Sequence, residues 1–533
     1  MVSLEGGEAA MVSAEFRPAA YVLMRGVPVS HLLGAAGRVL RFRADTLPAA
    51  DQARLYDLSA PVRAYHRFLS HCWNSPGWQK VIVLVSDHLG PSAFIAASVV
   101  AAVVHFAQQF YVLPTVVDPG VRFVRRCENG QENLVPDFYA TGAWELVLGE
   151  AAALVVLLGG HAFCTRTHYF FDCACIHQTD RVLKAAGVAH IPDFIRKSGE
   201  LCVLWDGEYL TRLWCVYELA VAHAPSARTP VRFVPLGMSV MLVQLHVFCF
   251  ATQSVKMGLF LCRTVNPRLP FWTRHLLAGR TVMFYVCVLT DACCFALVAR
   301  ASAELARMLR SMEEELNRFE VGKTEIFDED DRRMLYESIQ EMYGSLGAFD
   351  VAVRTQIGPD VMAAFTRQRA VLPYRALLVP LASQLPFMLS CCTGEIGRCA
   401  LTRTVAFATA VLESFVLQPL CIAVAMYLGS VAGKSACKGS WTQSAAIGFL
   451  VVCVHSFLFH CVSVFPFRGS RGGGPQREHD WTHVVFVVFL VVSLSCTAAV
   501  WLFRQTPAEA LEAAPAGSSR SLEMGAVQEE SSQ

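Results

Sequence analysis

Two short stretches of this chain hold residue types that can do chemistry: FFDCACIHQTD at residues 170–180 and YLTRLWCVYELAVA at residues 209–222. Both combine aromatic residues and cysteines with isolated charges, which is not the composition of a lipid-facing helix. Their acids include Asp172 and Glu218, and a carboxylate can bind sugar hydroxyls or stabilise a developing positive charge. A plainer interpretation also exists, in which Glu218 is a helix-terminus or surface charge and Asp172 caps a loop.

Metal binding is the second chemistry that the first stretch suggests. His168, Cys173, Cys175 and His177 all carry zinc-capable side chains. The run CACIH nevertheless lacks the paired C-x-x-C spacing of a structural zinc site. In an extended chain Cys173 and Cys175 point to the same side, which favours packing in a core. We therefore predict no metal site.

Short apolar runs on either side of these stretches are typical of strands, and they alternate with helical patterns. The predicted strands are 64–73, 168–172, 201–205 and 231–236. This alternation predicts a parallel sheet, whose sites gather at the carboxyl ends of its strands. Ser70, Asp172, Asp206 and the loop leading to Glu218 would meet at that edge. Thr211 is the expected N-cap of the helix that carries Glu218.

The composition of the whole chain is that of a membrane protein. Of its 533 residues, 54% are hydrophobic and only 17% are charged, whereas soluble domains carry about 25% charge. The net charge of +1 provides no basic surface field for nucleic acid. Many of the 20 cysteines lie inside apolar runs, where cysteine behaves as a small hydrophobic residue, so we expect a reducing compartment and no disulfide framework.

About eight segments are long and apolar enough to cross a bilayer as helices. They are residues 91–113, 142–163, 237–261, 281–303, 373–392, 405–428, 443–465 and 482–503. The segments 142–163, with two glutamates, and 373–392, with three prolines, are the weakest, and either can be re-entrant or interfacial. An even count places both termini on one side of the membrane, which we predict to be the cytosol.

The remaining segments are expected to be cytosolic. We divide the chain into an N-terminal segment (1–60), a soluble module in two parts (61–90 and 164–236) on either side of a membrane hairpin (91–163), membrane helices (237–303), a helical segment (304–370), further membrane helices (371–503) and a disordered tail (504–533). In 304–370, apolar residues recur at helical spacing, which predicts that the fourth span continues into the cytosol as an amphipathic helix. A packed helical linker is the favoured interpretation, and a coiled-coil partner site the alternative.

The soluble module resembles a TIR domain. FLSHCW, FFD and RKSGELCVLWDGEYLTRLWCVYEL are similar to the first strand of that family and to its later strand followed by Y-x-x-S-x-W-C-x-x-E-L. The chain also resembles the fungal HET domain, because D-x-x-C-I-x-Q falls on Asp172, Cys175, Ile176 and Gln178. In overall layout it is similar to predicted multi-pass membrane proteins of unicellular algae. Arg212 replaces the family serine, a membrane hairpin separates the first two strands, and the last strand of the family is absent.

This resemblance implies an abbreviated flavodoxin-like sheet and, in some family members, cleavage of NAD at the nicotinamide–ribose bond. Glu218 occupies the position of the carboxylate that would stabilise the ribosyl cation. Ser70, Asp172, Tyr209 and Trp214 are the corresponding candidates for binding the substrate. Self-association through the module is the other activity implied, and no bound cofactor is expected beyond NAD as a substrate.

Acids inside the predicted spans are the remaining signal. Asp291 and Glu413 are costly in lipid and should face partners or water. His246, His455 and His460 can pair with them or relay protons, although an interhelical hydrogen-bonded clasp is the plainer interpretation. The sequence thus predicts an α-helical polytopic membrane protein with a cytosolic signalling module, and as an alternative a transporter or channel with a non-catalytic regulatory module.

Overall fold

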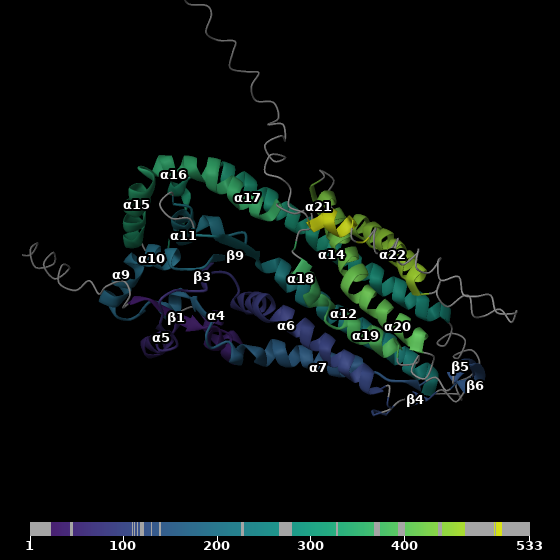
Figure 1. The fold of residues 1–533 in the computed structure, drawn as a ribbon. Coiled ribbons are helices and arrows are strands. Elements are labelled where there is room, and N and C mark those ends of the chain that lie inside the picture. Colours follow the sequence, from purple (N-terminus) through teal and green to yellow (C-terminus); the bar gives the residue numbers. More distant parts are fainter. Residues whose placement is uncertain are drawn as a thin grey trace, which may run out of the picture.

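The protein is elongated, with a sheet-containing module at one end and a bundle of long helices at the other (Figure 1). The computed structural model describes residues 23–42, 46–108, 110, 112–114, 116–117, 122–128, 131–137, 140–224, 229–265, 280–326, 329–366, 372, 374–392, 400–434, 440–463, 495 and 497–503. Both termini, including the predicted tail 504–533, lie outside these residues. The described part is mostly helical.

The module is built on one mixed sheet with the strand order β10-β9-β3-β8-β1-β2. These strands are β1 (Arg25–Pro28), β2 (Ala60–Pro61), β3 (Arg67–His71), β8 (His168–Phe170), β9 (Leu201–Trp205) and β10 (Val231–Pro235). The four strands from β10 to β8 are parallel, whereas β1 pairs antiparallel with both β8 and β2. The four predicted strands are therefore confirmed, and the segment before residue 61 adds two strands that the sequence did not predict.

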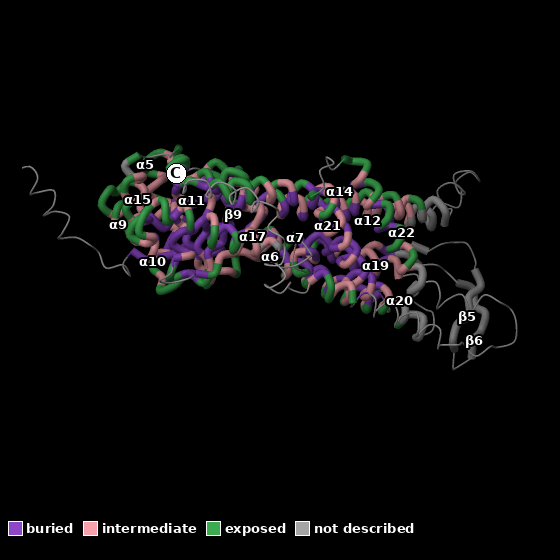
Figure 2. The backbone as a smooth tube through the Cα atoms, turned by 90° about the horizontal axis from the view of Figure 1, so that it is seen from above, coloured by how far each residue is buried: buried purple, intermediate pink, exposed green. Residues whose placement is uncertain are grey.

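Helices cover the two faces of this sheet. They include α4 (Gly34–Arg41), α5 (Ala49–Tyr56), α8 (Asp172–Cys175), α9 (Arg181–Ala189), α10 (Ile191–Arg196) and α11 (Leu213–His223). The central strand β9 reads LCVLW, and all five of its residues are buried, as expected of a parallel strand covered on both faces. Figure 2 shows the buried core of the module continuing toward that of the bundle.

Six helices of the described residues are long and apolar enough to cross a membrane. They are Gly77–Gln108, Trp144–Phe163, Leu236–Leu259, Tyr285–Asn317, Ala406–Lys434 and Trp441–Phe459. A seventh candidate is the pair Tyr374–Leu381 and Gln384–Cys392, which is bent by 53°. Prolines within this pair account for the break. Most of the eighth predicted span, 482–503, lies outside the described residues.

The bundle consists of α6 (Gly77–Gln108), α7 (Trp144–Gly159), α12 (Leu236–Val265), α14 (Arg280–Asn317), α18 (Tyr374–Leu378), α19 (Gln384–Cys392), α20 (Ala400–Leu412), α21 (Gln418–Lys434) and α22 (Trp441–Ser463). A π-helical turn, η8 (Glu413–Leu417), joins α20 to α21. Small hairpins lie at the end opposite the module: β4 (Val116–Val117) with β7 (Ala140–Thr141), and β5 (Arg122–Glu128) with β6 (Gln131–Asp137) (Figure 1).

Glycines let the bundle helices approach closely. An added Cβ at Gly429 or Gly433 of α21 would collide with the backbone of Ala299 or Ala303 of α14. The spacing of four residues places both glycines on one face of α21, which is the small-residue contact typical of membrane helices. The contact between α14 and α21 is therefore a backbone-to-backbone contact.

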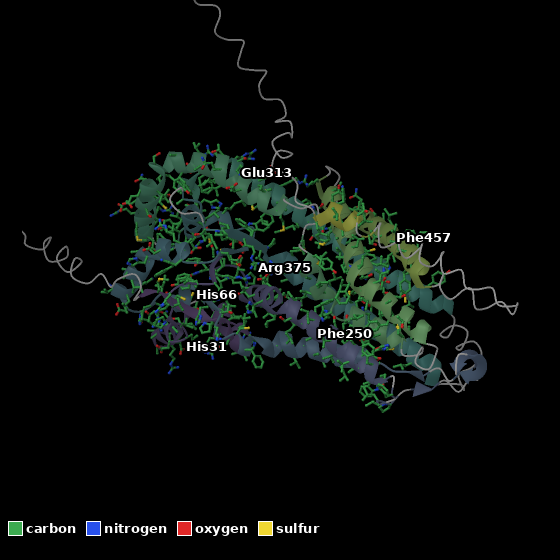
Figure 3. The ribbon with its side chains drawn as sticks, viewed as in Figure 1. His31, His66, Phe250, Glu313, Arg375 and Phe457 are labelled. Atoms are coloured by element: carbon green, nitrogen blue, oxygen red, sulfur yellow. The ribbon has the colours of Figure 1, made fainter. Side chains whose placement is uncertain are left out.

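Helix α14 continues beyond the bundle as one helix, as the sequence predicted, and it reaches the module, which the sequence did not predict. Glu313, on this extension, and Phe457, on α22, are labelled in Figure 3. The extension is followed by α15 (Glu329–Tyr343), α16 (Leu346–Ala352) and α17 (Gly358–Thr366). Met312, Leu316 and Phe319 of the predicted apolar face are buried, whereas Met308 is exposed. The segment packs on the module, since the Tyr343 hydroxyl donates to the carbonyl of Ala220 in α11 at 2.8 Å.

Four charged side chains join the module to α6. Asp87 of α6 accepts hydrogen bonds from Arg67 at 2.6 Å and from both terminal nitrogens of Arg232 at 2.7 and 2.9 Å. Glu200 lies 2.6 Å from Arg67 and 3.3 Å from Arg232. Because Arg67 and Arg232 begin β3 and β10, the cluster fixes α6 to the amino-terminal edge of the sheet.

Candidate functional site

Three of the predicted site residues meet at the carboxyl end of β3. The Ser70 hydroxyl, near the end of that strand, donates to Oε2 of Glu218 at 2.5 Å and lies 2.5 Å from the Tyr209 hydroxyl. Ser70 and Tyr209 are fully buried, and Glu218 is half-buried. The Tyr209 hydroxyl also contacts the carbonyl of Cys215 at 3.3 Å. The sheet edge thus brings together three side chains from β3, the loop after β9, and α11.

Local structure explains how these residues reach the edge. After β9 the chain forms a 3₁₀ turn at Tyr209–Thr211 and then enters α11 at Leu213. The predicted N-cap Thr211 is wrong, because Arg212 holds the cap position and makes no side-chain capping bond. Thr211 instead donates to the carbonyl of Glu208 at 2.7 Å. This turn directs Tyr209 into the core, and the second turn of α11 presents Glu218 to Ser70.

Burial perturbs the acidity of this cluster. Removal from water, assisted by the charge of Asp172, raises the pKa of Glu218 to about 8, and the hydrogen bond from Ser70 opposes the rise. Burial likewise holds the pKa of Tyr209 well above its usual value. At neutral pH Glu218 is therefore largely protonated, and it becomes a carboxylate when the pH rises or a cation approaches.

Asp172 forms a neighbouring cluster at the carboxyl end of β8. The strand ends at Phe170, so Asp172 starts the short helix α8 and is not the last strand residue. Its carboxylate accepts from Trp73 Nε1 at 2.7 Å and from the Cys173 amide at 2.7 Å, and lies 3.4 Å from Nε2 of His71. Burial acts to raise the pKa of Asp172, but His71, Trp73 and the amide together bring it well below its usual value.

A pocket of about 80 Å³ opens beside Asp172. Its lining includes His71, Trp73, Lys80, Phe171 and Cys173. Lys80, which the sequence reasoning missed, is buried in the first turn of α6 and lies 3.3 Å from Nδ1 of His71 and 2.8 Å from the Cys72 carbonyl. The only signal for it was a lone lysine at the start of an apolar helix. Ser70, Tyr209 and Glu218 are not among the lining residues, and neither is Asp172 itself, although its chain neighbours Phe171 and Cys173 are.

Trp214 lies away from these clusters. Its indole Nε1 donates to Asp331 of α15 at 3.3 Å. Nearby, Arg212 and Glu325 form a parallel backbone bridge and a side-chain contact of 3.6 Å. The structure thus places Trp214 against the helical segment that follows α14.

The cysteines of the first stretch are part of the core. Cys173 and Cys175 are buried, and Sγ of Cys175 accepts from the Phe171 amide at 3.3 Å. Burial raises the pKa of Cys175 to about 12, which keeps its thiol protonated. Among the described residues, no three histidine, cysteine, aspartate or glutamate side chains gather in a way that could hold a metal ion.

Comparison with known proteins adds no assignment: no family model, curated protein or solved structure matches the chain. The class of protein is therefore defined by the structure alone. The described residues of the chain contain six or seven helices long and apolar enough to cross a membrane, and a small α/β module. At the sheet edge of that module, Glu218 is largely protonated, and the neighbouring Asp172 has a lowered pKa and is ionised.

Proposed function

We propose that the chain is a multi-pass membrane protein whose cytosolic TIR/HET-like module signals by cleaving the nicotinamide–ribose bond of NAD. The cluster of Ser70, Tyr209 and Glu218 at the carboxyl edge of the sheet carries this proposal. Both termini lie in the cytosol in this arrangement. Self-association of the module is the second way in which such a domain signals, and it can accompany cleavage.

The order of the parallel strands supports a flavodoxin-like module. Numbered along the chain, β8-β3-β9-β10 is the order 2-1-3-4, which is that of the first four strands in flavodoxin-like sheets. In such sheets ligands bind outside the carboxyl ends of the strands where the order reverses, here between β3 and β9. Ser70 and Tyr209 lie at that point.

The chemistry of Glu218 supports its role. When the C1′–N bond breaks, nicotinamide leaves as a neutral molecule, and positive charge develops on the ribose before water adds to C1′ and loses a proton. A carboxylate nearby stabilises that charge. The nicotinamide ring of NAD is cationic. Its binding therefore favours the ionised form of Glu218, so the Glu218 carboxyl group loses its proton when NAD binds. The hydrogen bond from Ser70 holds the carboxylate in position.

The pocket beside Asp172 limits how NAD binds. Pockets that enclose a ligand of this size measure about 300–1,000 Å³. The space of about 80 Å³ admits only one small group. In the proposed complex this pocket holds one end of the dinucleotide beside Trp73 and Lys80, and the remainder lies over the carboxyl edge of the sheet, toward the half-buried Glu218.

Turnover of NAD by the full chain in lipid nanodiscs tests the proposal. Glu218→Gln preserves the shape and the hydrogen bond to Ser70, and we expect it to abolish turnover. Glu208→Gln is the matched control, because Glu208 is an exposed carboxylate in the same loop. Equal turnover in wild type and Glu218→Gln would remove Glu218 from the reaction. An inactive wild type would leave self-association, measured by light scattering, as the activity of the module.

A second candidate function, transport with a regulatory module, is favoured by one specific observation. Ionisable side chains in the helical bundle pair with one another across helices, and they do so without touching the NAD site.

A further inference from the structure

One face of α12 carries polar residues deep into the bundle. His246, Cys249, Gln253 and Lys256 follow one another at intervals of three, four and three residues, which places them on a single face of the helix. All four are buried. The rise of an α-helix makes this polar face about 15 Å long, roughly half the thickness of a bilayer core. Such a face is unusual for a helix that crosses hydrocarbon.

Each charged or amide group on this face has a partner on another helix. The three contacts are His246 Nε2 to Glu150 Oε1 of α7 at 2.9 Å, Gln253 Nε2 to Gln384 Oε1 of α19 at 2.5 Å, and Lys256 Nζ to Asp291 Oδ1 of α14 at 3.0 Å. The polar face therefore joins α12 to three neighbouring helices.

Two further carboxylate–imidazole pairs extend this set. Glu145 lies five residues before Glu150 on α7, about 7.5 Å along the axis, and its Oε1 is 3.3 Å from Nδ1 of His105 on α6. Glu413 Oε1 lies 2.7 Å from Nε2 of His455 on α22. His455 is also within electrostatic reach of Asp291 and Lys256. The pairs thus form a series through the bundle.

Glu413 stands at a distorted point of its helix. It begins the π-helical turn η8, and such turns inside helices often mark functional sites. Asp291 and Glu413 do not share a hydrogen bond, since Asp291 pairs with Lys256 and Glu413 with His455. Both carboxylates are nonetheless within electrostatic reach of His455.

Unpartnered polar atoms distinguish this set from a simple hydrogen-bonded contact (a clasp) between helices. Among the described buried atoms without a hydrogen-bond partner, four belong to this set: Glu150 Oε2, His246 Nδ1, Gln253 Oε1 and Glu413 Oε2. A clasp would satisfy both sides of each pair, because an unpaired buried polar atom is costly. Buried polar atoms of this kind are commonly satisfied by internal water molecules in proteins.

The charges of the set favour protons over metal ions. A carboxylate group and an imidazole group can each take up and release a proton. The Lys256 ammonium group lies on the same face of α12 as His246 and within electrostatic reach of His455, and its positive charge repels metal cations. The titratable and charged groups that the neighbouring helices add are His105 on α6, Glu145 on α7, Cys249 on α12, Cys287, Asp291 and Cys294 on α14, and Cys391 and Cys392 on α19.

We propose that the bundle conducts protons across the membrane along α12. In this path Glu150–His246 and Glu413–His455 are the proton-exchanging pairs, and Lys256–Asp291 is a fixed ion pair along it. Water at the unpartnered atoms carries protons from one pair to the next, and the Lys256 charge excludes metal cations. This activity is separate from the NAD chemistry of the module.

Proton flux into vesicles tests the path. The full chain is reconstituted in phospholipid vesicles that contain a pH-sensitive dye, and a potassium gradient with valinomycin supplies the driving potential. We expect the wild type to acidify the vesicles faster than protein-free vesicles. Glu150→Gln retains an oxygen that accepts from His246 but cannot titrate, so it should reduce flux to the protein-free rate. Glu413→Gln should do the same.

Glu313→Gln is the matched control, because Glu313 is exposed on the extension of α14 outside the bundle, and its flux should equal that of the wild type. If Glu150→Gln fails to fold, the exchanged variant Glu150→His with His246→Glu keeps one carboxyl and one imidazole group, and it should conduct. The proposal is overturned if the wild type conducts no faster than empty vesicles. It is also overturned if a folded Glu150→Gln or Glu413→Gln protein conducts as fast as the wild type. A folded exchanged variant without flux would overturn it too.

Discussion

Removal of the Ser70 hydroxyl is the sharpest test of the cluster at the sheet edge. Ser70→Ala takes away one hydrogen bond to Glu218 and one to Tyr209, and it leaves both groups without that partner. A neutral hydrogen bond contributes about 0.5–1.5 kcal/mol and one to a charged group about 1.5–3 kcal/mol. In the absence of both bonds, we expect the module to be about 2 kcal/mol less stable at neutral pH, where Glu218 is mostly protonated.

The pH dependence of this loss makes the test specific. Because the Ser70 bond favours the ionised form of Glu218, the substitution should raise the pKa of Glu218 above about 8. The bond becomes charge-assisted once Glu218 ionises, so the loss of stability should grow toward about 4 kcal/mol at alkaline pH. A structural cavity alone would cost the same at every pH.

Hydrogen exchange of the β9 amides, measured by mass spectrometry on the full chain in nanodiscs, reports the local free energy of opening. Thr355→Ala, which removes an exposed helical hydroxyl, is the control and should change this free energy by less than about 0.5 kcal/mol. A loss of stability below about 0.5 kcal/mol for Ser70→Ala, or one that does not change with pH, would refute the assigned geometry.

Three further predictions follow from the contacts described. Because the folded-state pKa of Glu218 is raised from 4.5 to about 8, the stability of the module should fall as pH rises through that window and level off above it. In Glu218→Gln, the exchange protection of α11 should not fall over this pH range. A pH profile equal to that of the wild type would contradict the assignment. Asp87→Asn leaves Glu200 as the one carboxylate shared by Arg67 and Arg232, so we expect a loss of about 2 kcal/mol that shrinks in high salt. The loss should appear as faster exchange at the start of β3 and β10, and Asp51→Asn, at a partly exposed helical ion pair, should have no such effect. Gly429→Leu should separate α21 from α14 and lower the thermal transition temperature of the bundle. Gly237→Leu is the control and should be tolerated, because an added Cβ there meets no atom within contact distance. Equal transition temperatures for the two variants would mean that the close contact is absent.

The parts of the fold that the sequence predicted well are those with strong periodic or apolar signals. Strand β9 and helix α14 were predicted because a five-residue apolar run and a long helical pattern each have one simple solution. Strands β1 and β2 were missed, since their sequences RGVP and AP contain glycine and proline, which are depleted in strands. The bend between α18 and α19 was left open, because prolines permit a break in a helix without fixing its angle.

In the candidate site, too, some residues were placed correctly from the sequence and others were not. Ser70 and Glu218 were expected at one edge because parallel strands share their carboxyl ends, and the structure brings them within 2.5 Å. Trp214 could not be placed, because its contact with Asp331 depends on how a distant helical segment folds back. The pairing of Glu150 with His246 likewise joins two helices far apart in sequence, and no local pattern specifies it.

The interruption of the sheet by a membrane hairpin has a consequence for biosynthesis. Strands β3 and β8 are neighbours, but α6 and α7 are synthesised between them. The ribosome must therefore deliver both helices to the insertion machinery before the second strand emerges. A nascent chain whose hairpin fails to insert leaves β3 without its neighbour and exposes apolar strands, on which chaperones and proteases act. Maturation of the module thus reports that the first two helices have entered the membrane correctly.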